Sequence, residues 1–344
     1  MKKDIVVWCF VGALIIAGIV AAMWPKALAE IATDTSHIFG TPTIHNPSVL
    51  FVGDIMLDRD VAVHAQQAGD DALFAGAADL FSGYDLRIGN LEGTITTNKS
   101  IAQQDHTILR FTFDPRFAKV LAQAGFDALS LANNHSLDFG EFGYDDTVSY
   151  LSKQNIPAFG SPFNEQHLAV RVSASGLRLC MLGYMDLFKS DPTSIINKIQ
   201  DIRGECDKVI VMPHWGVEYQ HSPTAQQVSL AHEFIDAGAD VIIGSHPHVV
   251  EPLEIYKGKA IFYSLGNFIF DQHWQPEVMR GLAVGIEFGE KSTRFTLTPV
   301  STNMEAKVAD EVVTKAVLND VVTPDLSVDM ANSILTTSSF ELPY

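Results

Sequence analysis

Histidine, carboxylate and amide side chains directly follow several apolar stretches of this sequence. The plainest case is ADVIIGSHPH at residues 239–248, where His246 and His248 flank a proline after a β-branched run. Imidazoles combined with carboxylate and amide oxygens form a donor set that suits zinc, manganese or iron(II) rather than calcium or copper(I). The residue types therefore predict a divalent transition-metal site.

Five separated segments supply such donors. The predicted ligands are Asp54, Glu92, Asn134, His214, His246 and His248. Six donors exceed what one tetrahedral ion needs, so one or two ions are expected, and a pair would lie about 3.5–4 Å apart with Glu92 as the bridge. A glycine precedes Asp54, Asn90 and Ser245, and we expect it to let the backbone turn sharply there.

Each motif also has a purely structural interpretation. A Gly-Asp pair after a strand commonly forms a turn or a helix cap, and Asn133-Asn134-His135 can satisfy its own loop backbone. His214 beside Trp215 can be a packed core histidine. Only the joint position of these motifs, at the ends of successive apolar runs, favours a common site.

Apolar runs rich in Val, Ile and Leu indicate the elements that position these residues. The runs are continuous rather than alternating, which predicts strands buried on both faces at residues 48–52, 86–89, 128–131, 177–183, 208–212, 240–243 and 260–264. Amphipathic stretches at 115–124 and 224–237 predict helices, the second capped by Ser222-Pro223 and closed by Gly238. This alternation predicts an α/β protein with a largely central sheet, in which ligands bind at the carboxyl ends of the strands.

The two ends of the chain differ from this pattern. Lys2 and Lys3 precede an apolar run over residues 5–23, which predicts an N-terminal membrane helix, or a signal segment if the chain is cleaved after Ala29. The predicted parts are an anchor or signal at 1–29, a linker at 30–47, the folded domain at 48–300 and a C-terminal extension at 301–344. We expect a hairpin over 281–300, then a helix and a mobile tail.

Composition narrows the classes of function and location. The 344 residues include 23 Lys and Arg against 41 Asp and Glu, a net charge of −18, which disfavours nucleic acid as a partner. Because positive residues precede the apolar run, we expect a single-pass protein of the cell membrane with its globular part outside the cytoplasm. Beyond that run only Cys180 and Cys206 remain, and we expect two small core residues rather than a disulfide framework.

Five motifs together resemble one known family. GDIML at 53–57, GNLEG at 89–93, SLANNHSLDFG at 130–140, PHWGVEY at 213–219 and GSHPHVVEPLEIYKGKAIFYSLGNFIFDQ at 244–272 are similar to the CapA family of poly-γ-glutamate capsule synthesis proteins. That family is similar to the calcineurin-like metallophosphoesterases. The resemblance implies a four-layer α/β/β/α sandwich of the metallo-dependent phosphatase type, the six ligands named above, and His135 as the catalytic, phosphate-facing histidine. Met56 departs from the broader Asp-x-His pattern, so one metal position lacks a ligand.

Two functions remain open on this basis. The leading one is a metal-dependent hydrolase of the cell envelope that acts on phosphoester or γ-glutamyl bonds in capsule or poly-γ-glutamate synthesis or export. Asn133 and Asn267 are its predicted substrate-binding residues, although a turn or support of His248 explains Asn267 nearly as well. The alternative is a non-catalytic, metal-containing subunit of a polymer synthesis or export complex. Expected partners are the membrane, other capsule or polymer synthesis subunits, and an anionic polymer or phosphoester substrate.

Overall fold

The computed structural model describes residues 45–188 and 191–344. The predicted membrane anchor at 1–29 and almost all of the predicted linker lie outside the described residues. Within the described ranges, no helix is both long enough and apolar enough to cross a membrane. Residues Asn46–Tyr344 form one compact unit, which therefore includes the predicted C-terminal extension.

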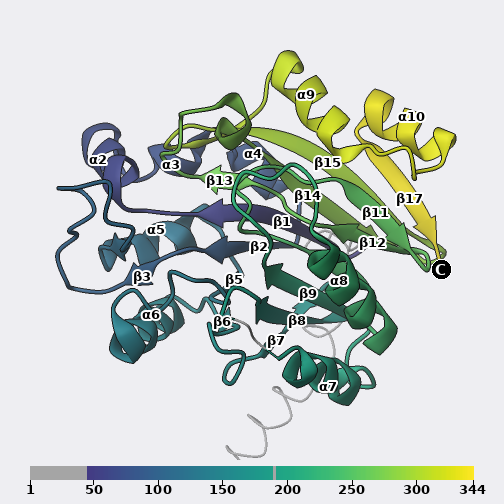
Figure 1. Cartoon of the computed structure of the whole chain (residues 1–344), viewed down its shortest axis with the longest axis horizontal. Coiled ribbons are helices and arrows are strands. Elements are labelled where there is room, and N and C mark those ends of the chain that lie inside the picture. Colours follow the sequence, from purple (N-terminus) through teal and green to yellow (C-terminus); the bar gives the residue numbers. More distant parts are fainter. Residues whose placement is uncertain (1–44, 189–190) are drawn as a thin grey trace, which may run out of the picture. The chain divides into compact units, whose positions relative to one another are not determined.

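The first sheet has nine strands and is built around β1 (Figure 1). Its order is β16 (Ala306–Val308), β15 (Ser292–Thr302), β14 (Arg280–Phe288), β1 (Ser48–Ile55), β2 (Leu86–Leu91), β5 (Ala128–Ser130) and β6 (Ala158–Phe159). In addition, β13 (Asn267–Ile269) pairs with β1, and β17 (Ser339–Pro343) pairs with β15. All eight residues of β1 are buried, as the continuous apolar run predicts for a strand covered on both faces.

The second sheet has six strands, in the order β11 (Leu253–Tyr256), β12 (Lys259–Phe262), β10 (Val241–Ile243), β9 (Lys208–His214), β8 (Leu177–Met185) and β7 (Ala169–Ala174). A further pair, β3 (Thr94–Ile95) and β4 (Thr112–Phe113), stands apart from both. The largely central sheet predicted from the hydrophobic pattern is wrong, because the buried strands are divided between two sheets, as the α/β/β/α sandwich implied by the family resemblance requires. A run that is apolar on both faces does not reveal which sheet covers it.

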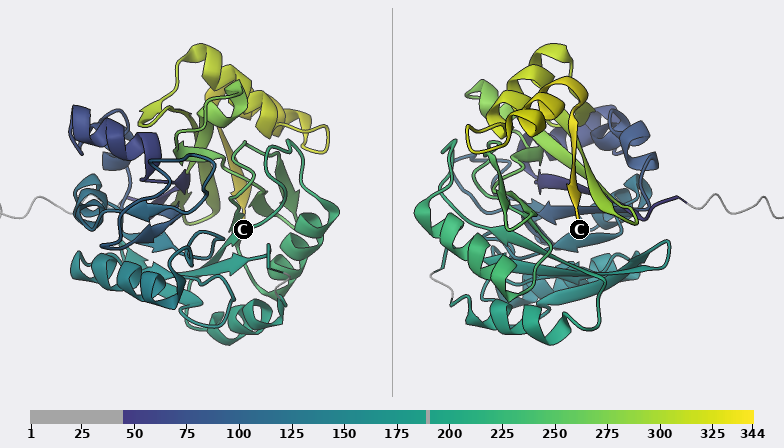
Figure 2. Two further views of the ribbon diagram at one scale, coloured as in Figure 1. Left: turned by 60° about the vertical axis from the view of Figure 1, so that its left-hand side comes forward. Right: turned by 90° about the vertical axis from the view of Figure 1, so that its right-hand side faces the viewer.

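Three apolar cores show how the sheets and helices are layered. Leu50 of β1 packs with α2 (Arg59–Ala68), α3 (Ala72–Ala75), α4 (Ala78–Ser82), α5 (Arg116–Ala124) and α6 (Gly140–Lys153). Phe51, on the other face of β1, packs with Met181 and Phe262 of the second sheet. Ile242, on the outer face of that sheet, packs with α7 (Thr193–Ile202) and α8 (Ala225–Ala237). The layers run helices, sheet, sheet, helices (Figure 2), and the predicted α/β class is confirmed.

The C-terminal residues complete the first sheet. The predicted hairpin over 281–300 is present as β14 and β15, with a short helix, η2 (Pro276–Met279), before it. Beyond it the expected helix and mobile tail are instead α9 (Glu311–Val321), α10 (Val328–Thr337) and β17. In β17, Phe340 lies opposite Phe295 of β15, and their rings stack at 4.7 Å. The buried residues of β17 alternate, as in a half-buried strand, but this pattern covers only five residues in a region of otherwise weak periodicity.

The start of α8 also differs from the prediction. Thr224, not Ser222, is its N-cap: the Thr224 hydroxyl accepts from the Gln227 backbone N–H, and the Gln227 side chain accepts from the Thr224 backbone N–H. This reciprocal capping box satisfies two donors that a helix start leaves free. Gly238 ends the helix as predicted.

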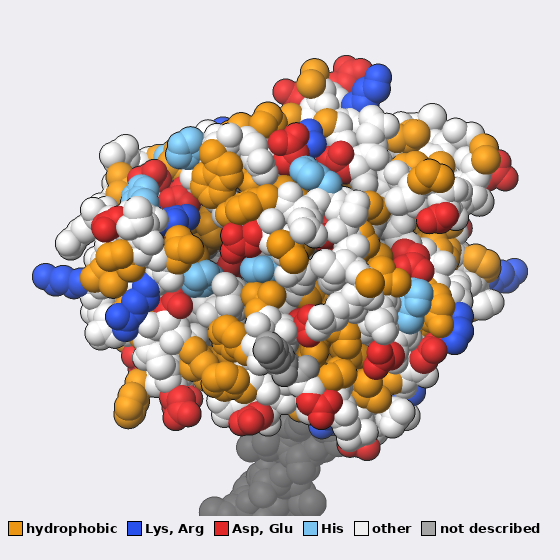
Figure 3. Space-filling view, viewed as in Figure 1, with side chains coloured by type: hydrophobic (Ala, Val, Ile, Leu, Met, Phe, Trp, Pro, Cys, Tyr) orange, Lys and Arg blue, Asp and Glu red, His pale blue; other side chains and the backbone are white. Residues whose placement is uncertain are grey.

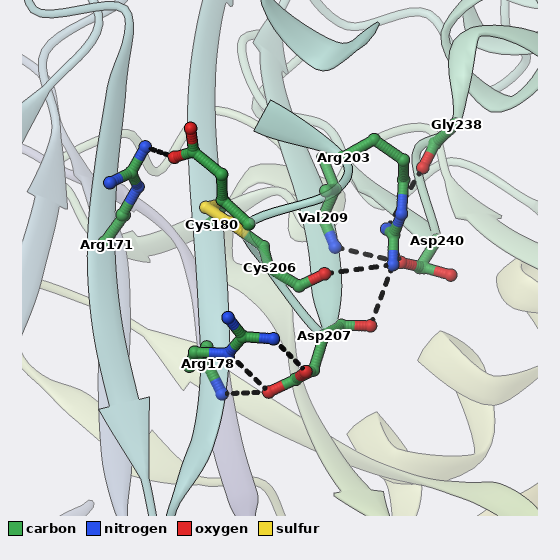
Figure 4. Close-up of a disulfide and its surroundings, with 10 residues drawn as sticks. Arg171, Arg178, Cys180, Arg203, Cys206, Asp207, Val209, Gly238 and Asp240 are labelled. Atoms are coloured by element: carbon green, nitrogen blue, oxygen red, sulfur yellow. Dashed lines mark hydrogen bonds and ion pairs between the residues drawn. A yellow bond between two sulfur atoms is a disulfide. The ribbon is translucent and has the colours of Figure 1, made fainter. Parts of the chain in front are cut away.

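Cys180 and Cys206 form a disulfide rather than standing as two separate core residues (Figure 4). Cys180 lies in β8, Cys206 precedes β9, and their Cα atoms are 5.9 Å apart across 26 residues of sequence. Both are buried, so the predicted burial is confirmed, and the bond between them was not predicted. The parallel pairing of β8 with β9 brings the two sulfurs together, which spacing alone does not reveal.

Candidate metal centre

The predicted ligands come from the carboxyl ends of strands in both sheets. Asp54 lies near the end of β1, and Glu92 directly follows β2. His214 ends β9 in the second sheet, and the loop after β10 carries His246 and His248. The arrowheads of β1, β2 and β9 point to the same side of the molecule (Figure 1), so the two sheets deliver their polar side chains to one region.

Two groups of potential ligand atoms lie within this region. Asp54, Glu92 and His214 each offer one atom within 4.8 Å of the others, and all three are buried. His246 and His248 form a second such group with Glu218. The sixth predicted ligand, Asn134, places its Oδ1 atom 2.8 Å from Nε2 of His214. The structure therefore brings all six predicted ligands together and adds Glu218.

Glu92 supplies the strongest evidence that a cation belongs here. Its side chain is fully buried, and neither carboxylate oxygen has a hydrogen-bond partner. Burial, reinforced by the nearby Asp54 carboxylate, raises the pKa of Glu92 well above its usual value. A buried carboxylate is costly unless it is paired or coordinates a metal. Since the side chains around Glu92 are mostly carboxylates and imidazoles, which bind divalent metals, the site fits one or two such ions.

Hydrogen bonds from the surrounding protein orient the imidazoles. Nδ1 of His248 lies 3.0 Å from Oδ1 of Asn267, so this nitrogen carries the hydrogen and Nε2 faces Oε1 of Glu92 at 3.8 Å. Nδ1 of His214 lies 3.0 Å from the Ser245 hydroxyl, which leaves Nε2 facing the site. Such outer contacts fix the ring orientation of metal-binding histidines.

Burial and neighbouring charges set the protonation of these rings. Burial, then the His246 and His248 rings, lowers the pKa of His214 well below its usual value. Burial, then the His248 ring, lowers the pKa of His246 to about 3, and its Nδ1 has no hydrogen-bond partner. Burial also disfavours a charged His248, but the Glu92 and Asp54 carboxylates outweigh it and raise its pKa to about 9. His214 and His246 are thus neutral, the form that binds metals.

The carboxylate of Asp54 is held between the two sheets. Its Oδ1 atom accepts a hydrogen bond of 2.8 Å from the Asn90 side chain, and its Oδ2 atom accepts one of 3.2 Å from the His246 backbone N–H. In register, Asp54 pairs with Asn90 of β2 on one side and Asn267 of β13 on the other. The register of these neighbouring strands thus places polar side chains side by side, and the Asn90 amide orients the Asp54 carboxylate.

His135 lies at the edge of the same cluster. Its Nδ1 atom is 2.9 Å from the Asp138 carboxylate, and its Nε2 atom is 3.9 Å from Oε1 of Glu92. The ring of Phe111 packs against it, with ring centroids 4.2 Å apart. Asp138 therefore fixes the ring so that Nε2 faces the metal-binding groups.

The two predicted substrate-binding residues are buried and bonded to protein. Asn133 donates to Asn90 and to the Leu91 carbonyl, and it accepts from the backbone N–H of His135. Asn267 donates to the Gln272 side chain and to the carbonyl of Val278, while its oxygen faces His248. Both side chains thus position the loops that carry His135 and His248, and substrate contact by either remains a prediction.

The glycines before Asp54 and Ser245 let neighbouring backbone pass close to them and do not form sharp turns. Gly53 does not adopt the left-handed conformation, but a Cβ added there would lie 1.9 Å from the carbonyl oxygen of Gly266. Gly244 has the same relationship with the carbonyl of Tyr263. The expectation of a sharp turn is therefore wrong at both. Neighbouring backbone passes so close that no side chain fits.

One side of the cluster reaches solvent. Asn134 is half-buried and Glu218 is exposed, whereas the other ligands are buried. On the face drawn in Figure 3, histidine and acidic side chains gather near the centre, in the region where the strands of Figure 1 end. A substrate would approach from this side.

Residues 48–272 match the bacterial capsule synthesis protein family PGA_cap. The chain belongs to this family. It is 36% identical over 271 residues to the PGA biosynthesis protein CapA of Bacillus subtilis, covering 74% of this chain and 71% of that protein. It is 32% identical over 286 residues to the capsule biosynthesis protein CapA of Bacillus anthracis, covering 76% and 67%. The resemblance found in the sequence motifs is confirmed.

A solved structure is also similar to this PGA_cap protein. It is a putative 5′-nucleotidase from Staphylococcus aureus, with a TM-score of 0.45 and 14% sequence identity. The match covers 78% of this chain and 55% of that chain.

Sequence reasoning missed three residues of this PGA_cap site. Glu218, Asp138 and Asn90 all lie inside motifs that were recognised, but none was assigned a role. Glu218 is four residues after a predicted ligand, and Asp138 is three residues after His135, so spacing from known site residues was an available signal. Asn90 and Asp54 are brought together by strand register, which no local spacing gives.

Proposed function

We propose that this PGA_cap family protein is a metal-dependent hydrolase that acts on phosphoester or γ-glutamyl bonds during capsule or poly-γ-glutamate synthesis or export. The observation that carries the proposal is the buried Glu92 carboxylate, whose oxygens accept no hydrogen bond and lie among two groups of ligand atoms. The layering of helices, sheet, sheet and helices is in keeping with a fold of the metallo-dependent phosphatase type. Family membership supports the capsule context, and the donor set supports the hydrolysis.

Each part of the site has a role in this reaction. Divalent ions held by these ligands would polarise the oxygen of the scissile bond and lower the pKa of nearby water. Asp54, Glu92, Asn134, His214, His246 and His248 would hold these ions. His135, oriented by Asp138, donates a proton through Nε2 to the leaving group or holds the developing oxyanion. Asn267 keeps His248 in its ligand orientation.

The proposed place of action is the outside of the cell membrane. The N-terminal apolar run anchors the chain there, or is removed after Ala29, and the folded unit faces away from the cytoplasm. The Cys180–Cys206 disulfide supports this location, because such bonds persist in oxidising compartments and are rare in the cytosol. Fractionation of cells that returns the full-length chain with cytosolic markers and with reduced cysteines would contradict it.

The decisive test is a joint measurement of metal content and activity. The full-length chain is purified in mild detergent, and its metal content is measured by elemental mass spectrometry beside the His246→Ala, His248→Ala double variant. Both proteins and His135→Ala are then assayed with phosphoesters and with γ-glutamyl peptides in the presence of Mn²⁺ or Zn²⁺. We expect bound metal and hydrolysis in the wild type, metal without hydrolysis in His135→Ala, and neither in the double variant.

The same experiment separates hydrolysis from a non-catalytic role. If the wild type binds metal but cleaves no substrate, and only the ligand variants abolish polymer production in cells, the subunit alternative is favoured. If His135→Ala abolishes polymer production while its metal content is unchanged, catalysis is favoured. A wild type that folds but binds no metal contradicts both.

A further inference from the structure

The second group of ligand atoms contains a residue that the six-ligand set does not include. Glu218 offers a carboxylate oxygen within 4.8 Å of the ligand atoms of His246 and His248. Its side chain is exposed, whereas both imidazoles are buried. Nδ1 of His246 is buried without a hydrogen-bond partner. No protein group therefore occupies this ring nitrogen, which could bind a metal ion.

The backbone holds Glu218 against the histidine loop. The N–H of Tyr219 donates a hydrogen bond of 2.8 Å to the carbonyl of Pro247, which is the residue between the two imidazoles. Gly216 and Tyr219 both adopt the left-handed conformation, with φ of 87° and 65°. A Cβ at Gly216 would lie 2.7 Å from the Gln227 side chain, so glycine is required there. These features bend the segment after β9 back over the His246 and His248 loop.

The neighbouring residue Tyr219 also faces the histidine loop. Its ring packs near His248, with centroids 6.2 Å apart. The Glu218 carboxylate reaches the same loop, since one of its oxygens lies within 4.8 Å of ligand atoms of His246 and His248.

The residue at the end of β1 does not contribute a ligand to this group. Met56 is fully buried in the core between the first sheet and its helices. Its sulfur accepts a hydrogen bond of 3.1 Å from the backbone N–H of Asp58. Met56 therefore supplies no ligand atom to an ion beside His248.

We propose that Glu218 is a ligand of a second metal ion, beside His246 and His248. The proposal rests on the proposed metal-dependent function and specifies its two-ion form. An anionic oxygen in place of a neutral nitrogen favours manganese over softer, imidazole-preferring ions at this position. The other ion would be held by the group of Asp54, Glu92 and His214 and would not need Glu218.

The test compares metal stoichiometry in Glu218→Gln, the wild type and a matched control. Glu290→Gln is the control because Glu290 is an exposed acid in the turn between β14 and β15, away from the strand ends that carry the ligands. The full-length chains are titrated with Mn²⁺ by calorimetry, and the loaded proteins are examined by electron paramagnetic resonance. Glutamine keeps the size of the side chain and removes its charge, and Glu218 is exposed, so the fold is expected to be unaffected.

We expect two Mn²⁺ ions and a spin-coupled spectrum in the wild type and in Glu290→Gln. Glu218→Gln is expected to bind one ion with a mononuclear spectrum, and Glu218→Asp to regain part of the second binding step. Two ions with an unchanged coupled spectrum in Glu218→Gln would overturn the role of Glu218 and leave the metal centre intact. A single ion in every protein would also overturn it, and no ion in any would overturn the proposed function as well.

Discussion

The Asp138 carboxylate lies 2.9 Å from Nδ1 of His135, three residues earlier in the same loop. The same oxygen accepts a hydrogen bond of 2.7 Å from the backbone N–H of Phe111, whose ring packs on the imidazole. The Phe111 N–H therefore holds the Asp138 carboxylate in place, and the carboxylate in turn orients the His135 ring. This carboxylate holds the hydrogen on Nδ1 and leaves Nε2 facing the candidate metal centre, 3.9 Å from Oε1 of Glu92.

This pair predicts a graded loss of activity without a loss of metal. His135→Ala is expected to lower kcat by about 10²–10⁴-fold, because a positioned proton donor contributes that much. Asp138→Asn is expected to lower kcat less and to change the pH profile, since the imidazole remains but its orientation and basicity change. Steady-state kinetics with parallel metal analysis measure both effects.

The double variant decides whether the two residues act as a unit. His135→Ala combined with Asp138→Asn is expected to be no slower than His135→Ala alone, because Asp138 acts through the imidazole. A multiplicative loss in the double variant would show that Asp138 has a separate role. A loss of bound metal in either single variant would instead show that the substituted residue, His135 or Asp138, is needed to bind the metal.

The grouping of the candidate ligands was predictable because local pattern places them after strands. Asp54, His214 and His246 follow apolar runs that form buried strands of the two sheets. Glu218 was missed because its position depends on two left-handed residues and a hydrogen bond to Pro247, none of which a pattern shows. The α/β class was likewise predictable, whereas the division into two sheets depends on contacts between distant strands.

Gly53 is predicted to be indispensable for the fold near the site. Gly53→Ala places a Cβ 1.9 Å from the Gly266 carbonyl, and backbone on both sides is fixed by strand pairing. We expect a loss of about 3 kcal/mol or more in the free energy of unfolding, or no folded protein. Gly204→Ala is the control, since nothing lies within 4 Å of its added Cβ. Equal stability of the two variants by chemical denaturation would contradict the close approach.

The disulfide is predicted to stabilise the second sheet. Closing a loop of 26 residues corresponds to about 3.5 kcal/mol in a chain-entropy account. The Cys180→Ala, Cys206→Ala double variant is expected to unfold at a lower temperature than the oxidised wild type. Reductant is expected to lower the melting temperature of the wild type and to leave that of the variant unchanged. A wild type indifferent to reductant, with two free thiols by alkylation, would contradict the bond.

Glu251 is a buried acid outside the metal-binding set. It is 1% exposed, its Oε2 atom accepts a hydrogen bond of 2.8 Å from Gln227, and its Oε1 atom has no partner. Burial raises the pKa of Glu251 to about 8, against 4.5 for an ordinary glutamate. Between these two values the unfolded chain has released a proton that the folded chain retains. Stability therefore falls as the pH rises through this window, and it is greatest below pH 4.5.

Replacing this acid by its neutral amide is expected to remove that pH dependence. Glu251→Gln keeps an oxygen for Gln227 and cannot ionise, so it is expected to gain about 1–3 kcal/mol of unfolding free energy over the wild type at pH 8. At pH 4.5 the difference is expected to be smaller, because the folded wild type is protonated and the unfolded chain is half protonated. Denaturant titrations at both pH values measure this change, with Glu290→Gln as an exposed control that shows neither effect. A Glu251→Gln variant that is less stable than the wild type at pH 8 would mean that the folded protein holds Glu251 ionised, with a partner for its charge.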